Sequence, residues 1–468
     1  MSSMMTVVFG LFVAAVYLVL YVIDRKVADD GKAVNYSNVV LLAASLFFVV
    51  YSDWRCLIIL LLMALVTYWT AKNRKFIKAG IVFDIAVLAV FKYFNFFIES
   101  FPFTFRLVMP LGLSFFVFSS IGYLVDVYRG KMECMSLTES VLFLSYFPKF
   151  TSGPIMKSTD YASQIRQRRS INYKGFEEGI EIFVFGLFKK VVLADWLAVF
   201  VDQVFSTPKA FGSLTIAFAV FSYSLQIYLD FSGYSDMAIG VSRMLGIRLP
   251  RNFNLPYLSN NVTEFWKRWH ISLSEWLMNY LYIPLGGNRK GRVRTYINLM
   301  LTMMLGGLWH GSGLNFLIWG TLHGLALVVH KLWVNFTHSD KKEHGLVSRL
   351  VSTVLTFVFV SFTWIFFRAD SLSTAMDIIS GIFSFRDGLQ QPYYWTFISI
   401  LFIGFANAVA VHESRGLERR KMNMCKVQGI YPLLDLSKFW NLVFFFVGCG
   451  LTIALFYADA NPFIYGAF

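Results

Sequence analysis

Charged residues are scarce in this chain. Only 15% of its 468 residues are Asp, Glu, Lys or Arg, whereas soluble globular proteins carry about 25%. The four cysteines are scattered without a CxxC pair, so the sequence predicts neither a disulfide framework nor a zinc site. Hydrophobic residues make up 57% of the chain and aromatic residues 18%. The long apolar runs between the few charges indicate an all-α polytopic membrane protein.

Common catalytic motifs are also missing. The sequence contains no GxGxxG, GxxxxGK[ST], GxSxG or HExxH pattern. None of His270, His310 and His323 is followed by Asp at four or five positions, which is the spacing of soluble and glycerolipid acyltransferases. We therefore expect no metal and no bound cofactor, and any chemistry must rest on other residues.

Apolar segments predict eleven or twelve helices, some of them too short to span a bilayer straight and therefore re-entrant. The first, residues 4–23, is followed by positive charges rather than preceded by them, which predicts a retained helix with its N-terminus outside. No internal repeat and no low-complexity linker divides residues 1–468, so we expect one integral domain. The further segments are 38–51, 57–71, 79–98, 108–128, 137–150, 176–204, 213–240, 296–316, 317–335, 349–368, 393–412 and 436–457.

The net charge of +14 is concentrated in four basic clusters, and short basic loops stay cytoplasmic. These clusters can set orientation and bind anionic lipid, or they can attract a phosphate-bearing donor such as a nucleotide thioester. No soluble basic module is present to bind nucleic acid. The clusters are Lys72, Arg74, Lys75 and Lys78; Arg166, Arg168, Arg169 and Lys174; Arg289, Lys290, Arg292 and Arg294; and Arg415, Arg419, Arg420, Lys421 and Lys426.

A 36-residue stretch from Thr295 to His330 contains no Asp, Glu, Lys or Arg. A straight helix of that length would measure about 54 Å, well beyond the ~30 Å hydrocarbon core of a bilayer. The chain must therefore break, and its glycines between 306 and 320 provide the places. His310 lies about 24 Å of helical rise from Arg294, deep in the membrane. Two interpretations stay open: a functional histidine, or a core histidine bonded by a neighbouring helix.

Residues 260–294 predict an amphipathic helix at the cytoplasmic boundary. Asn261 with Glu264 three residues later is a typical helix start, and a Trp-rich apolar face follows at helical spacing. His270 falls on that face, and the helix ends before a basic cluster. The Trp residues are interpreted as interfacial anchors, and His270 as functional or as part of the buried face.

Two carboxylates, Asp230 and Asp236, lie in apolar surroundings. Six residues apart, they do not share a helix face, so they are not an acid/base pair. Asp236 and Arg243 do share a face. The pattern favours buried ion pairs that hold helices together.

Several motifs together resemble the membrane-bound O-acyltransferase superfamily. They are LWHG around His310, EFWKRWHISLSEWL around His270, IPLGG at 283–287 and DFSGYSDMAIG at 230–240. SYFPKFTSGPI at 145–155 and VFVSFTWIFFRADS at 358–371 are similar to the bacterial alginate O-acetyltransferase branch. The resemblance covers most of the chain from about Pro110.

The resemblance implies a ring of tilted helices around a central catalytic tunnel, with a core at about 110–335 and C-terminal helices at 349–468. It also implies that His310 is the main catalytic residue and that His270 assists at the cytoplasmic entrance, whereas His323 matches no motif. At the basic entrance we expect four residues to bind the donor: Lys267, Arg268, Arg289 and Lys290.

The resemblance further implies an O-acetyltransferase of a bacterial cell membrane. An acetyl group, taken from acetyl-CoA, would be relayed to an extracytoplasmic SGNH-hydrolase-like partner and on to an alginate-like exopolysaccharide of the cell envelope. His310 would act as general base, with the WHGSG backbone N–H groups or Trp309 as oxyanion donors. Two alternatives stay open: D-alanyl transfer from a carrier protein to teichoic acid, and a proton-coupled transporter that uses His310 and Asp230.

Overall fold

The computed structural model of this protein describes residues 7–98, 106–337, 345–391, 394–404 and 439–456. Across these residues the chain is helical, with no strand beyond one isolated bridge between Phe211 and Leu389. The predicted all-α polytopic fold is therefore confirmed. The fourth basic cluster and parts of the predicted segments 393–412 and 436–457 lie outside the described residues.

Six of the described helices are long and apolar enough to cross a bilayer. They are α1 (Val7–Lys26), α2 (Asp30–Lys72), α3 (Ile77–Ile98), α9 (Ser213–Met244), α13 (Leu314–Thr337) and α14 (Leu346–Arg368). Four shorter apolar helices are α4 (Leu113–Tyr128), α15 (Leu372–Phe383), Tyr394–Gly404 and α17 (Phe439–Ala454). Several of the predicted segments are thus too short to span straight, as expected.

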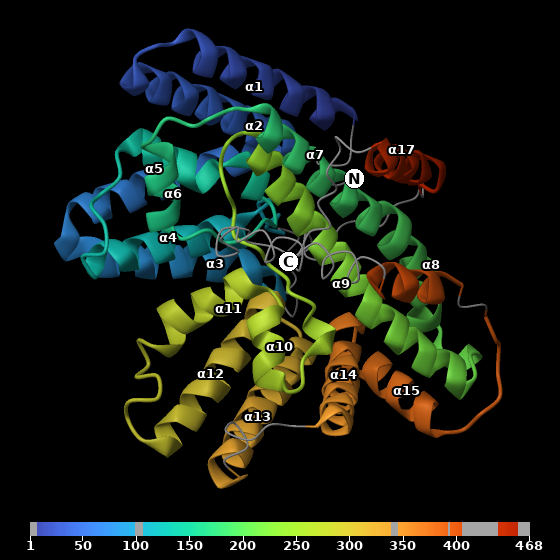
Figure 1. Cartoon of the computed structure of the whole chain (residues 1–468). Helices are drawn as coiled ribbons and strands as arrows, with labels where there is room; N and C mark the ends of the chain where they lie inside the picture. The colour runs from blue at the N-terminus through green and yellow to red at the C-terminus, as the bar shows by residue number, and fades with distance from the viewer. Residues whose placement is uncertain (1–6, 99–105, 338–344, 392–393, 405–438, 457–468) are drawn as a thin grey trace.

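The remaining helices are shorter or more polar and lie between these. They are α5 (Leu137–Ser145), α6 (Ser158–Ile165), α7 (Tyr173–Phe188), α8 (Asp195–Ser206), α10 (Val262–Arg268), α11 (Ile271–Leu277) and α12 (Arg292–His310). In Figure 1, α9 runs through the middle of the molecule beside α7. The helices α1 to α6 lie on one side of it and α12 to α14 on the other.

The 43 residues of α2 merge two predicted segments, 38–51 and 57–71. A straight helix of this length would measure about 65 Å. The helix instead kinks at Asp53, whose φ of −162° and ψ of 105° are not helical. The Asp53 carboxylate accepts a hydrogen bond from Arg55 Nε at 2.8 Å at the kink. The two segments predicted separately are thus one helix, bent at the polar SDWR sequence between them.

Glycines let α7 and α9 pack backbone to backbone. A Cβ added at Gly186 would lie 2.5 Å from the carbonyl oxygen of Gly233, and one at Gly179 would lie 2.7 Å from that of Gly240. Gly179 and Gly186 are seven residues apart on α7, and Gly233 and Gly240 are seven apart on α9. Both contacts therefore fall on one face of each helix. Small residues at such crossings are how membrane helices approach closely.

Buried ion pairs connect the same two helices. Lys189 Nζ lies 2.6 Å from Asp236 Oδ2, and Lys190 Nζ lies 2.5 Å from Asp230 Oδ1. The predicted pairing of both carboxylates is confirmed, but their partners are lysines and not Arg243, which pairs with Glu178. The two lysines lie in a π-helical turn, Lys189–Ala194, and both reach α9 from it.

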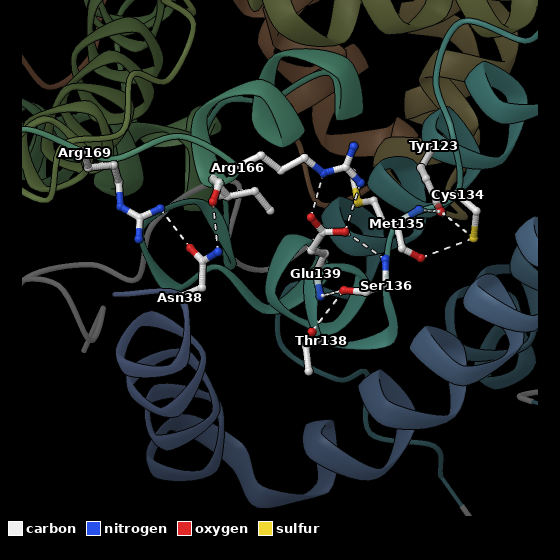
Figure 2. A network of polar contacts seen from close by, with 10 residues as sticks. Asn38, Tyr123, Cys134, Met135, Ser136, Thr138, Glu139, Arg166 and Arg169 are labelled. Carbon is white, nitrogen blue, oxygen red and sulfur yellow. Dashed lines mark hydrogen bonds and ion pairs between the residues drawn. The ribbon is translucent and has the colours of Figure 1, made fainter. Parts of the chain in front are cut away.

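Figure 2 shows a polar network that joins α2, α5 and the chain after α6. Glu139, in the first turn of α5, accepts hydrogen bonds from the Ser136 N–H at 2.8 Å and from Arg166 Nε at 2.7 Å. Asn38 of α2 accepts from Arg169 Nη1 at 2.9 Å and donates to the Ile165 carbonyl at 2.9 Å. Two residues of the second basic cluster are therefore structural.

Glu139→Gln is expected to lower the free energy of unfolding at neutral pH by about 0.5–1 kcal/mol, the range for a partly exposed pair. The hydrogen bond from Arg166 holds the pKa of Glu139 below its ordinary value near 4.5. A carboxyl with a depressed pKa stabilises the fold above its unfolded pKa and loses that effect as the pH falls through its folded pKa. The Tm difference between wild type and variant should therefore shrink as the pH falls below about 4.5; a difference independent of pH would contradict this.

Candidate active site

His310 is the last residue of α12, and the chain turns there into α13. The break lies at the predicted glycines: Gly311, with φ −177°, ends α12, and α13 begins at Leu314. The uncharged stretch is therefore a helical hairpin with His310 at its turn. The imidazole is 3% exposed and packs edge-on against Trp319 and Phe367, with ring centroids at 5.1 and 5.0 Å.

Neighbouring helices hold this turn in place. The hydroxyl of Tyr93 in α3 donates to the Leu308 carbonyl at 2.7 Å. The side-chain amide of Asn315 donates to the Ala369 carbonyl, just after α14, at 2.8 Å. Within the hairpin, Gly307 and Gly320 bring the two backbones into contact. The position of His310 is thus determined by three elements outside its own helix.

The predicted continuous helix through His270 is wrong. Asn261 does cap the start, with its side chain accepting the Glu264 N–H at 2.8 Å, but α10 ends at Arg268 and α11 begins at Ile271. His270 lies between them with φ +41°, in the left-handed region. A non-glycine residue there costs about 1–3 kcal/mol and is held only by surrounding structure.

Asn252 supplies that structure. Its backbone carbonyl accepts the Ile271 N–H at 2.9 Å, and its side-chain oxygen accepts the Ser272 hydroxyl at 2.8 Å. A residue 18 positions earlier in the chain therefore fixes the break between α10 and α11. Because strained backbone clusters at functional sites, the geometry marks His270 as more than a packing residue.

Trp309 lies between the two predicted histidines. Its ring centroid is 4.5 Å from that of His310 and 6.5 Å from that of His270. His270 is buried as predicted, at 1% exposure, and Phe231 of α9 packs against its edge at 4.6 Å. The structure thus brings together the two histidines that the sequence singled out, one from the end of α12 and one from the break between α10 and α11.

His323 is held by hydrogen bonds on both ring nitrogens. Trp266 Nε1 donates to Nδ1 at 3.3 Å, so in the neutral ring Nε2 carries the proton toward the Thr363 hydroxyl at 2.9 Å. An unbroken helix would have turned His323 away from His310. The hairpin instead places both against Trp319. This bonding gives His323 a structural role.

A cavity of about 170 Å³ opens beside this aromatic layer. It lies between α4, the chain at 155–160, Pro250–Arg251 and α11. Trp276 on its wall stacks on Phe118 at 4.2 Å, and Phe118 packs on Trp309 at 5.1 Å. Ser272 also lines it, two residues after His270. Contacting rings, Phe118 and then Trp309, therefore connect the cavity wall to the two histidines.

Two basic side chains, Lys157 and Arg251, lie at the cavity. Lys157 Nζ is 2.8 Å from Glu275 Oε2, and this hydrogen bond holds the pKa of the amine above its ordinary value. Asp160 is the other carboxylate of the lining, and Tyr280 donates to Asp126 at 2.7 Å at its edge. The lining thus carries two cations, Lys157 and Arg251, and two carboxylates, Glu275 and Asp160, so its formal charges balance.

The four predicted donor-binding residues do not line this cavity. Lys267 is exposed on α10, and Arg268 pairs with Glu264 at 2.5 Å. Arg289 and Lys290 are exposed in the turn before α12. Their role in donor binding stays a prediction.

Comparison with known proteins identifies the fold. The family model of the membrane-bound O-acyltransferase family (MBOAT) matches residues 46–342, more than half of the chain. The probable alginate O-acetylase of Pseudomonas syringae pv. tomato is 39% identical over 380 residues, covering 75% of this chain and 71% of that protein. The chain belongs to the membrane-bound O-acyltransferase family. It is an O-acyltransferase and a multi-pass membrane protein.

Other relatives of this O-acyltransferase differ in their named activity. The peptidoglycan O-acetyltransferase of Helicobacter pylori is 37% identical over 388 residues, covering 73% of each chain. The teichoic acid D-alanyltransferase of Streptococcus thermophilus is 31% identical over 255 residues, covering 50% of this chain and 61% of that protein. The region that the family model matches, residues 46–342, includes both histidines and the whole cavity lining.

Three site residues of the O-acyltransferase were not found from sequence. Lys157 follows the SYFPKFTSGPI motif by two residues, which was the available signal. Arg251 and Asn252 lie in a short segment after α9 with no motif of their own. Only the fold brings that segment against α11.

Proposed function

We propose that this O-acyltransferase takes an acetyl group from a cytoplasmic donor, acetyl-CoA, and relays it across the membrane for O-acetylation of an extracytoplasmic polysaccharide. The observation that carries the proposal is the buried pair His310 and His270 around Trp309, which Phe118 connects to a cavity whose lining includes Lys157 and Arg251. A base at that depth lets an acyl group cross while its hydrophilic carrier stays behind.

The size of the cavity supports a small acyl group. Sites that enclose a drug-sized ligand measure roughly 300–1,000 Å³, and this cavity measures about 170 Å³. It fits the reactive end of a thioester but not a whole nucleotide. The phosphates of acetyl-CoA would stay at the mouth, near Lys157 and Arg251, with Lys267, Arg268, Arg289 and Lys290 as further candidates nearer the basic surface.

His310 would act as general base. The acceptor hydroxyl gives its proton to the imidazole while its oxygen attacks the thioester carbonyl carbon. The carbonyl π electrons then form an oxyanion; when it collapses, the C–S bond breaks, and the thiolate leaves with the proton from His310. The N–H of Gly311 already donates to the Leu308 carbonyl at 3.2 Å. Trp309 Nε1, which has no hydrogen-bond partner in the described part of the chain, is the better candidate oxyanion donor of the two.

The relay requires an acceptor on the far side of the membrane. We propose an SGNH-hydrolase-like acetyltransferase partner that completes transfer to an alginate-like polymer, with the enzyme in the inner membrane of a bacterium. The relatives named for alginate and peptidoglycan O-acetylation support a glycan as the final acceptor. Most of the basic clusters would then contact anionic lipid of the cytoplasmic leaflet.

D-alanyl transfer to teichoic acid is the second candidate. The relative named for that activity is 31% identical and covers half of this chain, against 37–39% identity and about three quarters for the O-acetylating relatives. These values favour acetyl as the cargo. The transporter alternative loses its support, because the family consists of acyltransferases.

Donor choice tests the proposal directly. The purified enzyme in liposomes is expected to release free thiol from acetyl-CoA when an acceptor is present, and to leave a D-alanylated carrier protein unchanged. Thiol release and radiolabel transfer from each donor are the measurements, with empty liposomes as the control. Turnover of the D-alanyl carrier together with inert acetyl-CoA would overturn acetyl transfer in favour of the second candidate.

A further inference from the structure

A lysine amine is buried beside the two histidines. Lys92, in α3, holds its Nζ over the ring of Trp309, 5.2 Å from the ring centroid. The Nζ atom is inaccessible to solvent and forms no hydrogen bond to any residue that the structure describes. Lys92 and His270 are the charged or titratable neighbours that act electrostatically on His310. Three titratable groups therefore surround one tryptophan.

The ammonium of Lys92 also has no ion-pair partner in the described residues. The carboxylate of its own helix, Asp84, lies eight residues earlier and accepts a hydrogen bond from the Ser120 hydroxyl at 2.6 Å. Other buried lysines have a polar partner: Lys189 pairs with Asp236, Lys190 pairs with Asp230, and Lys149 donates to the Ser119 hydroxyl at 3.3 Å. Lys92 thus differs from the lysines that this fold uses to join helices.

Such a charge destabilises the folded protein. Taking an ammonium out of water without a counter-ion costs several kcal/mol, whereas a cation–π contact returns about 0.5–2 kcal/mol. A methionine of the same length would pack in the same place at lower cost. A buried charge beside a candidate general base is a recognised sign of function.

We propose that Lys92 is a further catalytic residue of this enzyme, whose positive charge stabilises the oxyanion formed during acyl transfer. The inference rests on the proposed function, because it assigns the charge to the thioester attack at His310. As the acceptor oxygen bonds to the carbonyl carbon, the C=O π electrons move to oxygen; Lys92 lies beside the place where that negative charge develops. On collapse the electrons return to the carbonyl, the thiolate leaves, and Lys92 keeps its proton throughout.

The position of Lys92 suits this task. Tyr93, the next residue, anchors α3 to the Leu308 carbonyl at 2.7 Å, so the stem of Lys92 starts from a fixed point beside the hairpin turn. The four-carbon stem lets the ammonium move off the ring toward a bound carbonyl. Together with Trp309 Nε1, it would provide two donors aimed at one oxygen.

Lys92→Met is the test, with Lys92→Arg as the charge-conserving variant and Lys78→Met, an exposed lysine of the same helix, as the matched control. Loss of an oxyanion donor lowers kcat by roughly 10²–10³-fold. We expect that loss in Lys92→Met with the KM for acetyl-CoA little changed, a Tm equal to or above wild type, and partial recovery of kcat in Lys92→Arg. Lys78→Met should match wild type in both readouts.

Two results would overturn the proposal. Wild-type kcat in Lys92→Met would remove Lys92 from the chemistry. A parallel fall of kcat and Tm in Lys92→Met would assign it a packing role. His310→Ala in the same assay separates this inference from the proposed function. If His310→Ala stays active, the proposed catalytic site is wrong. If His310→Ala is inactive and Lys92→Met is active, only the role of Lys92 is wrong.

Discussion

Replacement of His310 by alanine is expected to reduce kcat by about 10²–10⁴-fold, the usual contribution of a general base. The imidazole lies at the turn of the α12–α13 hairpin, buried among Trp309, Trp319 and Phe367. His323 cannot take its place, because it uses both ring nitrogens for structural hydrogen bonds. Thiol release from acetyl-CoA by the purified enzyme, and O-acetylation of the polymer in cells at equal expression, are the measurements.

His323→Ala is the control that separates chemistry from packing. It removes a buried imidazole from the same aromatic layer, 5.0 Å from Trp319. Because it leaves the Thr363 and Trp266 partners unsatisfied, it should lower the Tm by more than His310→Ala does. Activity per folded molecule should nevertheless survive in His323→Ala. Full O-acetylation by His310→Ala would exclude His310 as the base.

The helical hairpin around His310 could be predicted from the sequence because its cause is local. A charge-free stretch that is too long to cross the bilayer once must turn, and its glycines are the residues that permit a turn. The kink of α2 at Asp53 follows in the same way from a polar interruption of an apolar run. In both places the information lies within a few residues of the feature.

The break at His270 could not be predicted, because its cause is tertiary. The spacing of Trp266, Trp269, Leu273 and Trp276 favours one helix. Hydrogen bonds from the distant segment at 252–254 stabilise two helices instead. The ion pairs of Asp230 and Asp236 are a similar case. Helical spacing pointed to Arg243 on the same helix, but the π-helical turn of the neighbouring chain supplies two lysines instead.

Charge density did not identify the residues that line the cavity. The basic clusters are dense because they flank membrane helices, and the four residues chosen from them lie outside the cavity lining. The basic residues that do line it, Lys157 and Arg251, are isolated in the sequence. Lys92 is also isolated in the sequence: it is the single lysine in the aromatic run FKYFNFF.

Adding one methyl group at Gly307 is expected to disrupt the hairpin that carries His310. A Cβ at this position would lie 2.3 Å from the Phe316 carbonyl oxygen and 3.1 Å from the Gly320 Cα. Both are backbone atoms, so no rotamer change can relieve the clash, and α12 must move away from α13. Overpacking of this kind costs about 1–3 kcal/mol. Gly307→Ala should therefore lower both the Tm and kcat, since His310 lies three residues further along the displaced helix.

The adjacent Gly306 provides a matched control for this prediction. A Cβ there meets only the Leu277 Cδ1 at 3.6 Å, an ordinary van der Waals contact. Alanine is favoured over glycine inside a helix by about 0.5–1 kcal/mol, so Gly306→Ala should raise the Tm slightly and keep wild-type activity. The two variants differ by one position and make the same chemical change, yet the predicted shifts have opposite signs. Equal Tm shifts in the two would mean that the α12–α13 contact is looser than the structure has it, and His310 would then owe its position to Tyr93 and Asn315 instead.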